Sequence, residues 1–298
     1  MHVIAIDLGG TKLAGALFDS GGTVLRREVL PLGGLAGRGV GVLIQQLIQT
    51  LSADAHVEGV GVAVPGIYHS DRGTVWAPNI PGWEDYPLAE ELRAATNARV
   101  AVESDRTCYI LGETWQGHAR GMRNAIFIAV GTGIGAGIMS DGRVLRGAHD
   151  IAGATGWLAL SRDFKPEYEG CGDFEYHASG PGIARAAHCS TAEQAFAAYN
   201  RGDADAKAAI GQAVAYWGRA AANLVSIFNP EAIVFGGGVF GPAAALLDDV
   251  YQEALKWAQP ISITQVRFFA SALGPDAGLY GAGAVALEVA GRKVTITS

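Results

Sequence analysis

Two stretches of this chain follow the same plan: an apolar strand, a glycine turn, a second apolar strand and a further glycine turn. Residues 125–142 read AIFIAVGTGIGAGIMSDG, and residues 2–22, about 120 positions earlier, read HVIAIDLGGTKLAGALFDSGG. Each stretch is followed by elements of similar type, so we predict a duplicated β-β-β-α-β-α unit. This repeat restricts the chain to folds built from two similar α/β halves.

The glycines in these turns indicate that the backbone closely approaches another group. A glycine inside an apolar run weakens a strand by roughly 0.5–1 kcal/mol where only packing is involved. Glycine amides can point at an anion, as they do in loops that bind phosphate. Because a strand rather than a helix follows the turn, the pattern differs from the dinucleotide-binding fingerprint. We expect two hairpins that face one cleft and hold a polyphosphate; the alternative is a tight hairpin in a crowded core.

The composition is typical of soluble globular proteins. The 298 residues suffice for two domains, and the net charge of −7 argues against a nucleic-acid or anionic-membrane surface. The long uncharged runs are interrupted by glycine and are shorter than the ~20 residues of a membrane span. A strand begins at once, without a signal peptide, and three scattered cysteines offer no disulfide framework. These features predict a cytoplasmic protein.

Apolar patterning and turn signals predict the remaining elements. The first half contains strands at 3–7, 12–19, 23–30, 57–64 and 99–103, helices at 41–52, 87–97 and 105–118, and an aromatic loop at 67–86. The second half contains strands at 125–130, 134–139, 143–146, 156–160, 232–235 and 262–269, and helices at 191–200, 204–228, 241–257 and 276–290. We expect a first domain at 1–120, joined by the C-terminal helix segment 276–298, and a second at 121–275.

Three polar residues are candidates for chemistry. Asp7 precedes the first glycine turn; beside a phosphate it would need a cation, so it is a candidate Mg²⁺ partner through water, or it holds the turn by accepting backbone amides. Asp105 begins a helix after a strand, at the usual ligand edge of an α/β sheet, or it is an ordinary helix cap. Asn79, in a segment with two prolines, could bind a hydroxyl-rich ligand or serve as a turn residue.

Seven motifs, in this order along nearly the whole chain, resemble those of the ROK family, whose name stands for repressors, open reading frames and sugar kinases. They are DLGGTK at 7–12, GVGVAVPG at 59–66, Pro78-Asn79, Glu103-Ser104-Asp105, GTGIGAGI at 131–138, EYHASG at 175–180 and Gly236-Gly237-Gly238. The resemblance implies two duplicated actin-like (RNase H-like) βββαβα domains with a central cleft. Family repressors carry an N-terminal helix-turn-helix domain, which is not expected here because the first phosphate strand starts at residue 3.

The resemblance also implies an activity. It predicts a kinase that uses ATP and Mg²⁺ to phosphorylate a sugar or sugar-like acceptor, most often at the 6-hydroxyl of a hexose, with Asp105 as the general base. The residues implied for acceptor binding are Asn79, Ser104, Asp105, Glu175, Gly66, His149 and Trp157. Those implied for nucleotide binding are Gly9, Gly10, Thr11, Lys12, Gly131, Thr132, Gly133, Gly236, Gly237 and Gly238. Family members are often dimers, so a homodimer is expected.

The chain departs from the family pattern on the acceptor side. Members usually read Ala-Gly-Glu-Ile-Gly-His where this chain has AGATGW at 152–157, so a sugar-binding Glu and a zinc-binding His are replaced by Ala154 and Trp157. The family's three zinc cysteines are reduced to Cys171, and one cysteine cannot make a four-ligand zinc site. We expect no zinc, and a loop anchored instead by Phe164, Tyr168 and Phe174. The usual Asn before the catalytic Asp is Ser104.

Two classes of function therefore stay open. One is an active carbohydrate kinase with an atypical acceptor pocket. The other is a catalytically silent sugar- or nucleotide-binding regulator, because the loss of sugar ligands often accompanies the loss of turnover. Retention of Asp105 together with the nucleotide motifs favours the enzyme. An actin-like structural polymer is disfavoured, because the glycine-rich walls resemble those of sugar kinases.

Overall fold

The computed structural model describes residues 1–292 and divides into two compact units. Of the described residues, unit 1 contains Met1–Gly121, Arg146–Ala152 and those from Asp276 to Arg292, and unit 2 contains Met122–Leu145 and Gly153–Pro275. The short segment Arg146–Ala152 thus packs with unit 1, although the sequence analysis assigned it to the second domain. The part of the expected C-terminal helix at 293–298 lies outside the described residues.

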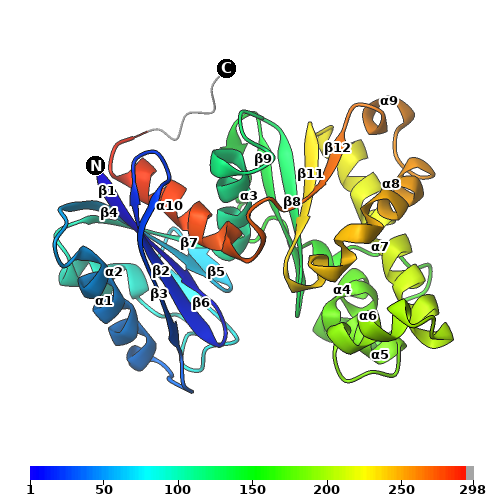
Figure 1. The fold of residues 1–298 in the computed structure, drawn as a ribbon, viewed down its shortest axis with the longest axis horizontal. Coiled ribbons are helices and arrows are strands. Elements are labelled where there is room, and N and C mark those ends of the chain that lie inside the picture. Colours follow the sequence, from blue (N-terminus) through cyan, green and yellow to red (C-terminus); the bar gives the residue numbers. More distant parts are fainter. Residues whose placement is uncertain (293–298) are drawn as a thin grey trace. The chain divides into compact units, whose positions relative to one another are not determined.

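The sheet of unit 1 has the order β3-β2-β1-β4-β7 (Figure 1). Its strands are β1 (His2–Leu8), β2 (Lys12–Asp19), β3 (Val24–Pro31), β4 (Val57–Val64) and β7 (Arg99–Ser104). Strands β1, β2 and β3 form an antiparallel meander, whereas β4 and β7 extend the sheet in parallel from β1. The predicted βββαβα order is therefore present in this unit.

Helices cover both faces of the sheet around β1, and successive side chains of this strand point to opposite sides, whereas the edge strand β3 is largely exposed. Ile4 and Ile6 join a core with residues of α1 (Arg38–Ser52) and α2 (Leu88–Ala95). Val3 and Ala5 join a second core with residues of α3 (Asp105–Gln116) and α10 (Ala277–Val289). Strand β1, buried on both faces, therefore holds the turn that follows it between two packed layers.

Unit 2 repeats the scheme with the order β10-β9-β8-β11-β12. Strands β8 (Ala125–Val130), β9 (Ile134–Ser140) and β10 (Arg143–Val144) form the meander, and β11 (Ala232–Gly236) and β12 (Arg267–Ala270) are parallel to β8. Each strand has a counterpart at the same place in unit 1, so the duplication predicted from the sequence is confirmed.

The other helices of unit 2 pack around the long helix α7 (Ala204–Phe228), about half of which is buried. The others are α4 (Asp173–Ala178), α5 (Gly180–Ala186), α6 (Ala192–Asn200), α8 (Leu247–Leu255) and α9 (Pro260–Ile263). Asp203 caps α7 by accepting the Ala206 amide at 2.9 Å, and buried Trp217 donates its indole N–H to the Ala178 carbonyl at 3.1 Å. Helix α7 thus holds the end of α4. Within residues 1–292, no helix is both long and apolar enough to cross a membrane.

The structure corrects three of the predicted elements. The aromatic loop contains a small hairpin, β5 (Ile67–His69) and β6 (Thr74–Trp76), whose turn uses Gly73 at φ 72°. The strand expected at 156–160 is a 3₁₀ turn at Thr155–Trp157, because the Gly153 carbonyl accepts the Ala136 amide and the chain then leaves the sheet. The strand expected at 262–269 is only β12, because Pro260 starts α9 and the Gln259 side chain caps it.

Candidate active site

The first glycine turn directly follows a partly buried carboxylate, Asp7. The Gly9 amide donates to the Lys12 carbonyl at 2.9 Å, so the turn is closed by its own backbone. Asp7 lies against Gly278 in the first turn of α10, where an added Cβ would be 2.7 Å from Asp7 Oδ2. Burial raises the pKa of Asp7 to about 7, with a contribution from Asp105 and opposition from Lys12. A buried carboxylate of this kind gains from a nearby cation.

Asp105 is the first residue of α3, at the carboxyl end of β7. The Arg106 amide donates to its Oδ1 at 2.7 Å, and the Tyr109 hydroxyl donates to Oδ2 at 3.3 Å. Burial raises the pKa of Asp105, while the Arg106 charge and amide act in the opposite direction. Both oxygens are therefore oriented, and the carboxylate is more basic than an exposed one.

Sequence reasoning missed Tyr109. Its hydroxyl contacts the candidate base, and the Asp105 charge is the main reason that the pKa of Tyr109 lies well above its usual value. The spacing from Asp105 is one helical turn, i to i+4, which brings side chains together on a helix. Once a helix had been predicted from 105 onward, that spacing was the available signal.

Another carboxylate, Glu103 on β7, lies two residues before Asp105. It is buried, with 8 % of its surface exposed. Arg146 donates from Nε to Glu103 Oε1 at 3.2 Å, and its Nη2 is 3.0 Å from Oε2. Burial raises the pKa of Glu103, and the Arg146 charge lowers it. This ion pair fixes one end of the segment Arg146–Ala152 to β7.

The other end of that segment is fixed by Asp150. Its Oδ2 accepts both the amide and the hydroxyl of Ser70, each at 2.9 Å. His149 lies between the two attachments and is exposed. Asn79 is also exposed and lies beside the first turn, since a Cβ on Gly10 would be 3.8 Å from its Cβ. Gly66 has a packing role, because a Cβ there would overlap the Trp76 carbonyl oxygen.

In unit 2, the second glycine turn borders a cavity of about 410 Å³. The lining brings together distant parts of the sequence: Gly131, Thr132, Gly180, Pro181, Ala184, Ser190, Thr191, Ala192, Glu193, Gly238, Val239 and Pro242. The Gly180 amide donates to the Gly131 carbonyl at 2.8 Å, which fixes one wall. Apart from Gly180, which ends the EYHASG motif, the residues from α5 and α6 were not predicted, because nothing in their sequence points to this cavity.

Only one glycine of the Gly236-Gly237-Gly238 motif lines this cavity. Added Cβ atoms on Gly236 and Gly237 would overlap Phe127 and the Val130 carbonyl, whereas one on Gly238 would meet no heavy atom within 4 Å. The motif therefore combines two packing glycines with one glycine that opens onto the cavity.

Glu175, on α4, supports the second glycine turn. Its Oε2 accepts the Ile134 amide at 2.6 Å. Burial raises the pKa of Glu175, and this hydrogen bond lowers it. Ala154 and Trp157 precede α4; the Trp157 ring is 57 % exposed and borders a second cavity, of about 490 Å³, with Phe164 and Tyr168.

The loop that replaces the zinc motif is anchored by only two of the three expected aromatic residues. Tyr168 and Phe174 are buried, but Phe164 is 70 % exposed and meets the Tyr168 ring edge-on, so its prediction as an anchor was wrong. Cys171 makes only a weak contact with the Gly172 carbonyl, at 3.7 Å. In the part of the chain that the structure describes, no cluster of three or more His, Cys, Asp or Glu residues could hold a metal ion.

The fold and these sites define a class: α/β proteins with two actin-like (RNase H-like) units, each carrying a glycine hairpin. A family model described as "ROK family" matches residues 3–289, and the chain belongs to that family.

Three relatives illustrate the range of the similarity. The glucokinase of Halalkalibacterium halodurans is 31% identical over 94% of this chain and 93% of its own length. The bifunctional enzyme NanE/NanK of Brucella suis is 34% identical over 94% of this chain, which spans only 52% of that enzyme. The ROK hexokinase from Thermus thermophilus, known from its crystal structure, is 33% identical in sequence and superposes on this chain with a TM-score of 0.83. The match covers 97% of this chain and 99% of the hexokinase.

Proposed function

We propose that this protein is a carbohydrate kinase that transfers the γ-phosphoryl group of ATP to a hydroxyl of a sugar or sugar-like acceptor. The observation that carries the proposal is the environment of Asp105 in a chain of the ROK family. Its carboxylate lies at the ligand edge of the sheet, each oxygen has an oriented partner, and burial raises its pKa.

Asp105 is the general base in this proposal. It accepts the proton of the attacking hydroxyl as the bond to phosphorus forms, a role worth roughly 10²–10⁴-fold in rate. A raised pKa suits the role, because a more basic carboxylate takes the proton more readily. The Tyr109 hydroxyl fixes Oδ2, so the carboxylate does not need to reorient during the reaction. We assign acceptor binding near this base to the exposed Asn79 and His149.

The nucleotide belongs to the cavity of about 410 Å³ in unit 2. Thr132 offers a backbone amide for phosphate, Gly131 leaves room for its approach, and Gly238 and Val239 offer a flat wall for the base. Asp7 fits an Mg²⁺ ion that travels with the nucleotide, since its buried carboxylate lies beside the first glycine turn and its pKa is raised to about 7. When bound, the ion would neutralise charge on the phosphates.

The acceptor pocket is atypical in this proposal. Ala154 presents a methyl group where most family members, by the resemblance above, have a carboxylate. Trp157 adds a large exposed ring beside a cavity of about 490 Å³. These features favour an acceptor with a hydrogen, methyl or acyl group on that side over one with a free hydroxyl. The similarity to both a glucokinase and a NanE/NanK enzyme is compatible with either kind of acceptor.

A silent sugar- or nucleotide-binding regulator is the second candidate. The observation that favours it is the replacement of the acceptor-side carboxylate by Ala154. Against it, Asp105 keeps two oriented partners, which a protein that only binds ligands does not need.

A coupled assay for ADP release, run with Mg²⁺ and a panel of hexoses, acylated hexosamines, deoxysugars and cyclitols, tests the proposal. The kinase predicts acceptor-dependent ADP release that is lost in Asp105→Asn. Binding of sugar or ATP by calorimetry, without acceptor-dependent release from any member of the panel, would support the regulator instead.

A further inference from the structure

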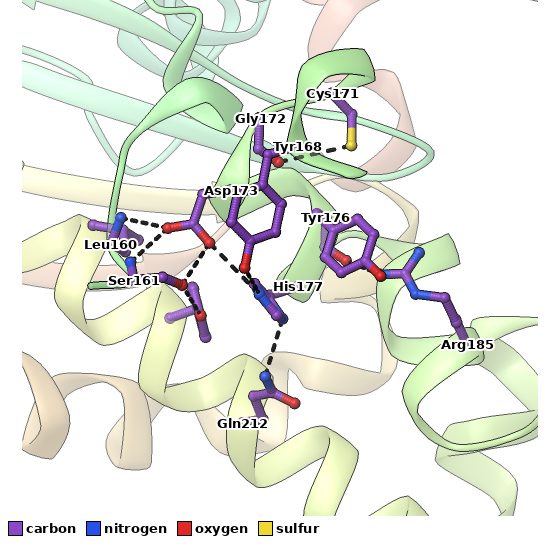
Figure 2. Close-up of polar contacts among 11 residues, drawn as sticks. Leu160, Ser161, Tyr168, Cys171, Gly172, Asp173, Tyr176, His177, Arg185 and Gln212 are labelled. Atoms are coloured by element: carbon purple, nitrogen blue, oxygen red, sulfur yellow. Dashed lines mark hydrogen bonds and ion pairs between the residues drawn. The ribbon is translucent and has the colours of Figure 1, made fainter. Parts of the chain in front are cut away.

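Helix α4 is too short to be stable alone, because isolated helices below ~12–15 residues are marginal in water. It spans only Asp173–Ala178, yet it carries Glu175, which holds the second glycine turn. Something else must fix the helix in place. Figure 2 shows the side chains that do so.

Asp173 provides the first attachment. Its carboxylate is nearly buried and accepts three hydrogen bonds: from the Leu160 amide at 2.6 Å, the Ser161 amide at 2.5 Å and the Ser161 hydroxyl at 2.7 Å (Figure 2). Bonds to an ionised acceptor are about twice as strong as neutral ones. Removing this carboxylate would also leave two amides without their acceptor, which adds a desolvation penalty.

His177 provides the second attachment, one helical turn later. Its Nε2 is 2.8 Å from the Tyr168 hydroxyl, and its Nδ1 is 3.0 Å from the Gln212 side chain on α7. The ring stacks on Tyr216 with centroids 4.6 Å apart, and Tyr216 in turn bonds the Ser161 hydroxyl at 2.6 Å. The two attachments are therefore linked through Ser161 and Tyr216 into one network. Its members are Ser161, Tyr168, Asp173, His177, Gln212 and Tyr216.

Glu175 lies between these two attachments in sequence but points the other way. Residues at i and i+4 share a helix face, whereas the residue between them at i+2 lies on the opposite side. Its Oε2 bonds the Ile134 amide, and added Cβ atoms on Gly133 and Gly156 would lie 2.8 Å and 2.9 Å from the same oxygen. The carboxylate therefore fits tightly, and a small shift of α4 would disturb the turn.

We infer that Asp173 and His177 are positioning residues that act through Glu175, with the hydrogen-bond network taking the structural place of a metal at this loop. The network holds α4 against the 158–161 segment and α7, and α4 in turn holds the 131–134 turn through Glu175. This inference rests on the proposed function only where the turn is assigned to the nucleotide.

The first test does not depend on catalysis. Amide hydrogen exchange of the peptide that contains Ile134 is compared in wild type, Asp173→Ala and Tyr168→Phe, with Asp163→Ala as control. Asp163 is an exposed carboxylate of the same loop. We expect exchange of this peptide to rise about 10-fold or more in Asp173→Ala and several-fold in Tyr168→Phe, which keeps the buried ring, and to stay unchanged in the control.

The distribution of the effect decides between positioning and general stability. Faster exchange across all of unit 2, in equal measure, would overturn the inference, as would unchanged exchange at Ile134. If Asp173→Ala does not fold, exchange of the Ile134 peptide is compared between wild type and Tyr168→Phe alone, because this substitution deletes one hydroxyl and keeps the packed ring.

The second test is a double-mutant cycle with Glu175→Ala, which removes the acceptor of the Ile134 amide, read as KM for acceptor and for ATP and as kcat. If Asp173 acts through Glu175, Asp173→Ala should change these constants about 10-fold or more in wild type and less than about 2-fold in the Glu175→Ala background. Additive effects in an active enzyme would overturn the inference. A wild-type protein without kinase activity would instead refute the proposed function, and the exchange experiment would still test the network.

Discussion

The two glycine hairpins share a backbone plan and differ in the chemistry around it. In unit 1, Asp7 pairs with Ala14 across the hairpin, one pair before the last. The corresponding pair in unit 2 is Ala129 with Gly135, and neither residue ionises. Both units thus have the turn, but only in unit 1 does the strand before it carry a carboxylate; the carboxylate at the second turn, Glu175, comes from α4.

The support of the two turns also differs. Each turn has a backbone hydrogen bond of its own, from the Gly9 amide to the Lys12 carbonyl in unit 1 and from the Gly131 amide to the Gly133 carbonyl in unit 2. The first turn is further backed by α10 behind Asp7, and the second by Gly180 and Glu175, which bond to Gly131 and Ile134. A repeated topology therefore does not imply repeated function. Unit 1 has a carboxylate on the hairpin itself, whereas the turn of unit 2 borders a cavity and is supported by residues of its helical region.

The sharpest test of this division is Asp105→Asn in unit 1. Only proton acceptance is removed, so we expect kcat to fall by roughly 10²–10⁴-fold with both KM values changed by less than a few fold. Steady-state kinetics measure kcat and both KM values, and a thermal melt checks that the variant keeps its fold. Near-normal turnover would reduce Asp105 to a helix cap.

The acceptor side of the proposal predicts that glucose is a poor substrate. A glucose hydroxyl that faces Ala154 lacks a charged partner worth roughly 1.5–3 kcal/mol, which corresponds to about 10- to 150-fold in kcat/KM. Ala154→Glu alone should help little, because Trp157 still occupies the pocket wall. A wild-type kcat/KM for glucose of about 10⁵ M⁻¹s⁻¹ or above would contradict this prediction.

Gly131→Ala tests whether the second turn approaches a ligand. A Cβ on Gly131 would meet no protein atom within 4 Å, so the fold should accept it. If the backbone lies against phosphate, KM for ATP should rise by about 10-fold. Gly211→Ala is the matched control, because Gly211 also has open space around it but lies on α7. The control should leave KM unchanged and raise stability by up to about 1 kcal/mol.

A smaller effect is expected from the pH dependence of stability. The pKa of His177 is lowered from 6.5, mainly by burial and also by Lys165 and Arg185, against the effect of Asp173. The folded state therefore holds His177 neutral where the unfolded chain binds a proton, so its contribution is complete above pH 6.5 and is lost as the pH falls through the folded-state pKa. The drop in melting temperature between about pH 7.5 and pH 5.5 should be smaller in His177→Gln and unchanged in His56→Gln, an exposed control.

The smallest expected effect is that of zinc. Because Asp173 and His177 hold the loop by hydrogen bonds, chelation followed by addition of Mg²⁺ should change neither the melting temperature nor the activity. Stoichiometric zinc in the purified protein, together with lost stability after chelation, would contradict this expectation.

Much of the fold followed from local patterns. Strands β1, β2, β8 and β9 lie within a residue or so of their predicted bounds, because apolar runs between glycine turns have few other ways to fold. Predictions failed where tertiary contacts overrode local signals. The 156–160 segment leaves the sheet because Gly153 packs on Ala136, and residues 146–152 join unit 1 because Glu103 and Ser70 bind them.

By itself, the sequence determined the duplicated α/β plan, the two glycine turns and the position of Asp105 between a strand and a helix. These features depend on residues close together in the chain, and local conformational preference is sufficient to fix them. Only the tertiary structure decided that Tyr109 holds Asp105, that residues from α5 and α6 line the cavity beside Gly131, and that Asp173 and His177 hold the helix of Glu175. Such partners come together through packing and buried hydrogen bonds whose geometry leaves no periodic signal in the sequence.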